Sequence, residues 1–336
     1  MKRFLAVLLI SAVSSCRVEV GAQSRDAAGE AATVRVYSSI YKHVIDAIQP
    51  VLAARLRAAG YSAVRVEWFQ SGSEKVAARL DAELASGGSP CDLLLTSDPT
   101  YYQRLKHDGN LVPYISPASL KYPLQYLDRD GAFALSRLST MALAVSSKLP
   151  EGRVPASFRD LAKGGGVRVA LGDPLASGTT LTAVAAIAGR YGWDWFRAVK
   201  RARGVVVGGN AAVLQRVESG ESDVGIVLLE NVLASRARGS KVRLVIPSDG
   251  AVIIPGPIAL LPHGARSLAA RAVYDALLSD EVQRILIDPG LLHSPNPALP
   301  PPPGAPPLRE LLSAQFPLSP EPPAQVKAAF NAIFFQ

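Results

Sequence analysis

Short apolar runs alternate with longer amphipathic segments through the first third of the chain. The apolar runs predict strands near 33–37, 64–68 and 92–96. Apolar residues at helical spacing predict helices near 42–59, 73–85 and 99–108. Strands that alternate with helices in this way are typical of a parallel sheet covered on both faces.

The same alternation restarts after residue 150. Apolar runs there predict strands near 167–171, 205–207 and 223–228. The amphipathic segments predict a helix starting near 179, then others near 193–201, 211–219, 267–279 and 280–288. A second α/β unit is therefore expected inside the chain.

Two longer apolar strands, near 138–145 and 252–261, flank this second unit. Because each would carry the chain from one unit to the other, they predict a hinge of two strands. We therefore expect an α/β fold with two lobes and two parallel-rich sheets. The first lobe would comprise 31–140 and 262–336, and the second 145–250.

The C-terminal section is rich in proline, with four consecutive prolines at 300–303. Such a segment runs extended over a surface. The apolar residues Phe330, Ile333, Phe334 and Phe335 beyond it predict a docked strap with a terminal anchor. The alternative is a flexible tail that binds a partner.

The N-terminus has the pattern of an export signal. Lys2 and Arg3 precede an apolar run of about ten residues, which is too short to span a bilayer. Residues 13–16, Val-Ser-Ser-Cys, resemble a bacterial lipobox, in which Cys16 would be lipidated and become the new N-terminus. The alternative is cleavage after residue 22, so 1–22 hold the signal in either case, and 17–31 read as a tether.

Composition excludes a disordered chain, because 49% of the 336 residues are hydrophobic and only 19% are charged. Losing Lys2 and Arg3 lowers the formal net charge from +8 to +6. No stripe of basic and aromatic residues accompanies this charge, so we expect no nucleic-acid partner. With Cys16 acylated, Cys91 has no cysteine partner and is expected to be a buried filler.

The segment 172–180, Gly-Asp-Pro-Leu-Ala-Ser-Gly-Thr-Thr, joins a predicted strand to a predicted helix. Unpaired backbone N–H groups, hydroxyls and the positive end of the helix dipole would meet there, which suits an anion. The local alternative is an ordinary N-cap. A nucleotide-hydrolysing phosphate loop is not expected, because Thr179 stands where that loop needs a lysine.

Polar turns also follow the other predicted strands, at 38–39, 70–73, 97–98, 208–210 and 230–231. Ligands of parallel sheets collect at the carboxyl ends of strands, so facing lobes would place these turns in one cleft. No Gly-x-Ser-x-Gly motif occurs, and the four histidines show no metal-binding or catalytic spacing. The sequence therefore predicts a binding protein without catalytic residues or a cofactor.

Several stretches together resemble a known family: 36–39, 68–75, 92–105 with 111–114, 172–180 and 209–225. The chain is similar to the ferric-ion and organophosphate branch of type 2 bacterial solute-binding proteins, the receptors of ABC importers. The resemblance implies a periplasmic lipoprotein, monomeric, whose lobes close on a small anionic solute and deliver it to an inner-membrane permease.

The resemblance also implies which residues contact the solute. The implied ligand-contact positions are Ser38, Ser39, Ser71, Gly72, Ser177, Gly178, Thr179, Thr180 and Asn210. Each of these nine has a local alternative, as a strand end, a helix cap or a turn. In addition to these, we expect Glu230, together with Asn210, to contact the part of the solute beyond its anionic group.

Ferric-binding members of the family use an adjacent tyrosine pair after the strand that is here 223–228. This chain has Leu-Leu-Glu-Asn at 228–231 instead, which removes the oxygen ligands that Fe³⁺ prefers. Tyr101 and Tyr102 are expected to be a packed pair on a helix of the first lobe. A phosphorylated organic solute or a phosphonate is therefore expected; the alternatives are a ferric receptor using Glu230, a tyrosine and a co-bound anion, or an exported phosphate-ester hydrolase.

Overall fold

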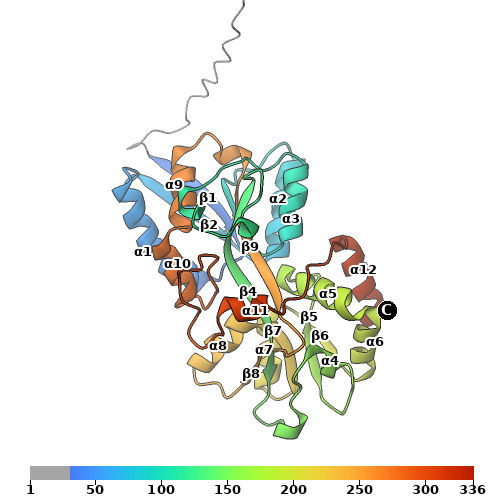
Figure 1. The fold of residues 1–336 in the computed structure, drawn as a ribbon. Coiled ribbons are helices and arrows are strands. Elements are labelled where there is room, and N and C mark those ends of the chain that lie inside the picture. Colours follow the sequence, from blue (N-terminus) through green and yellow to red (C-terminus); the bar gives the residue numbers. More distant parts are fainter. Residues whose placement is uncertain (1–30) are drawn as a thin grey trace, which may run out of the picture.

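The computed structural model describes residues 31–336 (Figure 1). The predicted signal peptide and Cys16 lie outside these residues. Within 31–336, no helix combines the length and the apolar character needed to cross a bilayer.

Three parallel strands form the sheet of the first lobe, which we call lobe 1. They are β2 (Val64–Gln70), β1 (Ala32–Ser38) and β3 (Leu93–Leu95), with β1 in the middle. The helices that follow them are α1 (Lys42–Ala58), α2 (Ser73–Ala85) and α3 (Pro99–His107). Two later helices, α9 (Leu268–Leu277) and α10 (Asp280–Ile287), pack on α1.

The second lobe, lobe 2, repeats this arrangement. Strand β5 (Val169–Gly172) pairs in parallel with both β6 (Val205–Val207) and β7 (Val224–Leu228). Its helices are α4 (Phe158–Leu161), α5 (Gly178–Tyr191), α6 (Trp193–Arg201), α7 (Asn210–Glu218) and α8 (Leu229–Ala237).

Two long antiparallel strands form the hinge between the lobes. β4 (Phe133–Val145) pairs with β9 (Val252–Leu260), from Phe133 opposite Ala259 to Met141 opposite Val252. β9 also pairs with β3, and β4 with β7 and β8 (Arg243–Val245). The predicted α/β class and two-strand hinge are confirmed. The lobes share one mixed sheet, in the order β2-β1-β3-β9-β4-β7-β5-β6, because the hinge strands pair at both edges.

The chain after α10 crosses the hinge once more. His293 exchanges backbone hydrogen bonds with Leu138 of β4, and the Phe316 N–H donates to the Ala251 carbonyl at 2.7 Å. This crossing carries α11 (Leu308–Leu312) and ends in α12 (Pro323–Phe334). The strap is therefore docked along the hinge rather than free.

The C-terminal helix α12 packs on α5 and α6 of lobe 2 (Figure 1). Phe330 is fully buried, and its ring lies 5.7 Å from that of Phe196. The prediction that 262–336 joins lobe 1 is therefore wrong for α12. The reason is that its apolar face, with Val326 and Ile333, completes the hydrophobic core of lobe 2.

Candidate functional site

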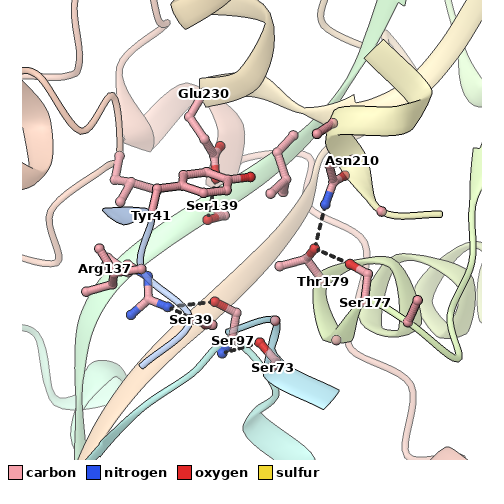
Figure 2. Close-up of a pocket in the computed structure, with 18 residues that line it drawn as sticks. Ser39, Tyr41, Ser73, Ser97, Arg137, Ser139, Ser177, Thr179, Asn210 and Glu230 are labelled. Atoms are coloured by element: carbon pink, nitrogen blue, oxygen red, sulfur yellow. Dashed lines mark hydrogen bonds between the residues drawn. The ribbon is translucent and has the colours of Figure 1, made fainter. Parts of the chain in front are cut away.

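A cavity of about 220 Å³ lies between the lobes (Figure 2). Seven of the ten predicted ligand-binding residues line it: Ser39, Gly72, Ser177, Gly178, Thr179, Asn210 and Glu230. Polar lining residues that were not among the ten are Tyr41, Ser73, Ser97, Arg137 and Ser139. The cavity therefore gathers hydroxyl and amide groups from both lobes and from the hinge.

Five helices begin at this cavity. The first residues or N-caps of α1, α2, α5, α7 and α8 all lie in its wall. Four of the N-caps, Tyr41, Gly72, Gly209 and Leu228, give no side-chain cap to their helices. Backbone N–H groups at such helix starts are unpaired and carry partial positive charge. The wall is thus suited to an anion.

The start of α5 supplies most of the lobe 2 donors. Ser177 is the N-cap, and its hydroxyl accepts from the Thr180 N–H at 3.3 Å. The Ser177 and Thr179 hydroxyls lie 3.0 Å apart, and Asn210 Nδ2 donates to Thr179 Oγ1 at 2.9 Å. The N-cap alternative and the anion-site interpretation therefore coexist at Ser177.

Asn210 also has an unpaired polar atom in the cavity wall. The residue is 7% exposed, and its Oδ1 has no hydrogen-bond partner in the described part of the chain. Whichever way the amide is oriented, one of its two polar atoms stays unpaired. A buried unpaired amide atom costs free energy, which makes Asn210 an unusual residue of this wall.

Three predicted contact residues do not line the cavity. Ser38 is fully buried, and its hydroxyl accepts from the Ile40 N–H at 3.0 Å. Thr180 packs over Gly172, where an added β-carbon would lie 2.5 Å from Thr180 Oγ1. Ser71 is half-buried and donates its backbone N–H to the Ser38 carbonyl. In this structure the hydroxyls of Ser38 and Thr180 make local contacts within the fold, and Ser71 lies away from the cavity.

Arg137, in the hinge strand β4, is the cationic residue of the wall. It is 3% exposed, and its Nη2 donates to Ser97 Oγ at 2.8 Å and to Ser39 Oγ at 3.2 Å. Burial lowers the pKa of Arg137 to about 10, which leaves it charged at neutral pH. Arg137 was not predicted from the sequence; the available signal was a single charged residue within a strand of apolar and small polar residues.

A β-bulge gives Arg137 its position. The register between β4 and β9 shifts between Leu135 and Arg137, so that Ser136 is the extra residue. Opposite Arg137 stands Gly256, where an added β-carbon would lie 2.6 Å from Arg137 Cγ. Only glycine leaves room for the arginine side chain at this point.

Glu230 is the anionic residue of the wall. It is 5% exposed, and its Oε1 accepts from Ser139 Oγ at 2.8 Å. Burial raises the pKa of Glu230 to about 7, against the lowering effects of Ser139 and Arg137. Tyr41 lies beside it (Figure 2). The Tyr41 hydroxyl donates to Asn231 Oδ1 at 3.1 Å, which joins lobe 1 to lobe 2.

The two lobes touch at the edge of the cavity. An added β-carbon at Gly178 would lie only 2.8 Å from Ser73 Cβ, across the interface between α5 and α2. Glycine therefore permits the close approach of the two helix starts.

The other candidate groups take structural roles. Tyr102 is fully buried and donates to the carbonyls of Leu94 and Pro257, while Tyr101 donates to Asp81. The expected packing of this pair is thus confirmed, as is the burial of Cys91. Among residues 31–336, no group of three or more histidine, cysteine or acidic side chains is placed to hold a metal ion.

Comparison with solved structures establishes the fold. Iron-bound HitA from Pseudomonas aeruginosa matches with a TM-score of 0.77 and 21% identity, covering 90% of this chain and 99% of that one. AfuA from Actinobacillus pleuropneumoniae, with fructose-6-phosphate bound, matches with a TM-score of 0.77 and 17% identity, covering 90% and 98%. The substrate-binding protein of an Agrobacterium tumefaciens ABC transporter matches with a TM-score of 0.76 and 18% identity, covering 90% of this chain and 94% of that one.

Comparison of sequences gives the family. No significant match is found among curated proteins. The sequence pattern of the family described as bacterial extracellular solute-binding protein matches residues 34–292, which is more than half of the chain. Together with the two-lobed fold and the interlobe cavity, this match means that the chain belongs to the bacterial extracellular solute-binding proteins.

Proposed function

We propose that this protein is the monomeric receptor of an ABC importer and captures a small organic anion, a phosphate ester or a phosphonate. The observation that carries the proposal is the convergence of five helix starts and the buried Arg137 on one cavity. Such groups hold an anion through charge-assisted hydrogen bonds and perform no reaction on it.

The proposed cycle needs only binding and release. The anion would be surrounded by groups from both lobes and the hinge: Ser177, Gly178, Thr179 and Asn210 from lobe 2, Ser39 and Gly72 from lobe 1, and Arg137 from the hinge. Closure would exclude water and strengthen these hydrogen bonds. We further propose lipidation at Cys16, so that the receptor works from the membrane surface of the periplasm beside its permease.

A thermal-shift series tests the proposal. The purified protein is melted with ethyl phosphate, methylphosphonate, inorganic phosphate, sulfate and Fe³⁺. A solute at 100 times its Kd stabilises the folded state by about 2.7 kcal/mol. We expect organic phosphates or phosphonates to raise the Tm, and a response to Fe³⁺ alone would contradict the proposal.

Thr179→Val identifies the site of binding. Valine keeps the shape but removes the hydroxyl, so affinity for the anion should fall by about tenfold or more. The matched control is Thr182→Val on the same helix, whose hydroxyl donates to the Gly178 carbonyl and does not line the cavity. Equal losses in both variants would place the anion elsewhere.

A ferric receptor is the second candidate. Tyr41 and Glu230 lie in one wall and offer the hard oxygens that Fe³⁺ prefers, and a solved neighbour is iron-bound. Burial raises the pKa of Tyr41 to about 12, which opposes formation of the phenolate. Iron loading followed by visible spectroscopy tests this candidate, since tyrosinate bound to Fe³⁺ is coloured.

For the hydrolase alternative, a phosphate-release assay with ethyl phosphate should detect no product.

A further inference from the structure

The cavity wall contains one buried cation and one buried anion that do not bind each other. Arg137 directs its hydrogen bonds to Ser39, Ser97 and Ser136. Glu230 accepts from Ser139, and none of the described ion pairs joins it to Arg137. Each charge is therefore held by neutral hydroxyls, in the same cavity.

Buried charges without a charged partner are costly, and a solute that supplies the opposite charges offsets this cost. Arg137 and the helix starts account for the anionic group of the solute. A simple anion leaves Glu230 without a charged partner, because it brings a second negative charge near the carboxylate.

The surroundings of Glu230 indicate what that partner is. Tyr41 is in the same wall, and its ring is fixed by the hydrogen bond from its hydroxyl to Asn231. Figure 2 shows Tyr41 and Ser139 near the Glu230 side chain, with Thr179 and Asn210 on the other side of the cavity. A carboxylate beside an aromatic ring is a favourable environment for an ammonium group.

We propose that the solute is a zwitterion, whose anionic group binds the helix starts and Arg137 and whose ammonium group binds Glu230 beside the Tyr41 ring. This inference rests on the proposed function and narrows its solute class. A solute without a cationic group leaves Glu230 unpaired. Burial raises the pKa of the free Glu230 to about 7, and a bound ammonium group would lower it again because it favours the ionised carboxylate.

A series of matched phosphate esters tests the inference. Ethyl, 2-hydroxyethyl and 2-aminoethyl phosphate differ mainly in the terminal group, and the propyl, 3-hydroxypropyl and 3-aminopropyl esters extend the same comparison by one carbon. Kd values are measured by calorimetry at pH 8, where Glu230 is mainly ionised and the amines are protonated. We expect the amine to bind at least about tenfold tighter than its alkyl and hydroxyl counterparts at one of the two lengths, as for a desolvated ion pair.

Glu230→Gln provides the site-specific test. It should reduce the preference for the amine over the alkyl ester to about threefold or less, because the ammonium group loses its charged partner. Glu221→Gln, an exposed carboxylate outside the cavity, is the control and should preserve the preference. If Glu230→Gln does not fold, Tyr41→Leu removes the ring and should also lower the preference.

The outcomes separate the two proposals. Binding of alkyl esters with no preference for the amine at either length overturns the zwitterion and leaves the anion receptor intact. Equal affinity for hydroxyl and amine esters also overturns it, since a neutral donor would then suffice. Binding of Fe³⁺ with no response to any ester overturns the proposed function itself.

Discussion

Lys327 and Glu74 form an ion pair that connects the two lobes at the rim of the cavity. Lys327 belongs to α12, which packs on lobe 2, whereas Glu74 lies in the first turn of α2 in lobe 1. Glu74 directly follows Ser73, which lines the cavity. The last helix of the chain therefore stabilises the contact between lobes from outside the solute site.

Lys327→Met should weaken solute binding without touching the cavity. The pair is largely buried, with the Lys327 and Glu74 side chains 30% and 17% exposed. Its loss should destabilise the closed state by about 1 kcal/mol and raise Kd about fivefold. The control is Lys121→Met, whose pair with Asp280 lies within lobe 1. Calorimetry with ethyl phosphate makes the comparison, and equal Kd values in both variants would show that the interlobe pair does not assist closure.

Gly178→Ala should hold the lobes apart. The new β-carbon would lie 2.8 Å from Ser73 Cβ, so the two lobes could not approach as closely as they do here. We therefore expect solute affinity to fall about tenfold or more. Gly189→Ala is a matched control on the same helix, because its β-carbon would meet nothing closer than 3.9 Å. That variant should keep its affinity and gain up to about 1 kcal/mol of stability. Small-angle scattering with and without solute would report the loss of closure directly.

Gly256→Ala should act on the solute through Arg137. The alanine methyl would displace the arginine side chain, whose Cγ lies 2.6 Å from the position of the new carbon. Because charge-assisted hydrogen bonds contribute about 1.5–3 kcal/mol, affinity should fall at least about tenfold, as in Arg137→Met. The double variant should lose little more than Arg137→Met alone. Additive losses would mean that Gly256 acts independently of Arg137.

The free protein should lose stability as pH rises toward 7. Burial raises the folded-state pKa of Glu230 to about 7, above its ordinary value of 4.5. Between these two values the folded state binds more protons than the unfolded state, so stability falls with rising pH and then levels off above 7. Glu230→Gln removes this contribution and should be the more stable form above pH 7, by up to about 3 kcal/mol. Denaturant unfolding of both proteins between pH 5 and 8 measures the difference, and parallel pH profiles would contradict the assignment.

Phe330→Ala should destabilise lobe 2. Phe330 is fully buried against Phe196 and Phe334, so truncation should cost about 3–5 kcal/mol. Phe335, the penultimate residue of the printed sequence, is 56% exposed, and Phe335→Ala should change stability by less than about 0.5 kcal/mol. Calorimetric melting compares the two. A small effect at Phe330 would mean that α12 is not part of the lobe 2 core.

Much of the secondary structure followed from local pattern. The predicted helices at 73–85 and 193–201 have the observed bounds, because their apolar spacing and preceding turns are local features. Helix α8 was not predicted, since β7 ends at Leu228 and the helix begins at Leu229 with no glycine or proline between them. The junction of strand and helix at 172–180 was equally local, because Gly-Asp-Pro ends the strand and the Ser177 cap begins the helix.

The sequence by itself determined the α/β class, the two-strand hinge and most of the polar turns that line the cavity. Only the tertiary structure decided which hydroxyls enter that cavity: Ser39 does, whereas Ser38, one residue earlier, is buried in the strand. It also decided that Arg137 lies in the wall, through a bulge and a glycine more than 100 residues away, and that α12 belongs to lobe 2. The physical reason is that helices and turns depend on neighbours in sequence, whereas strand register and packing partners depend on residues that meet only when the chain has folded.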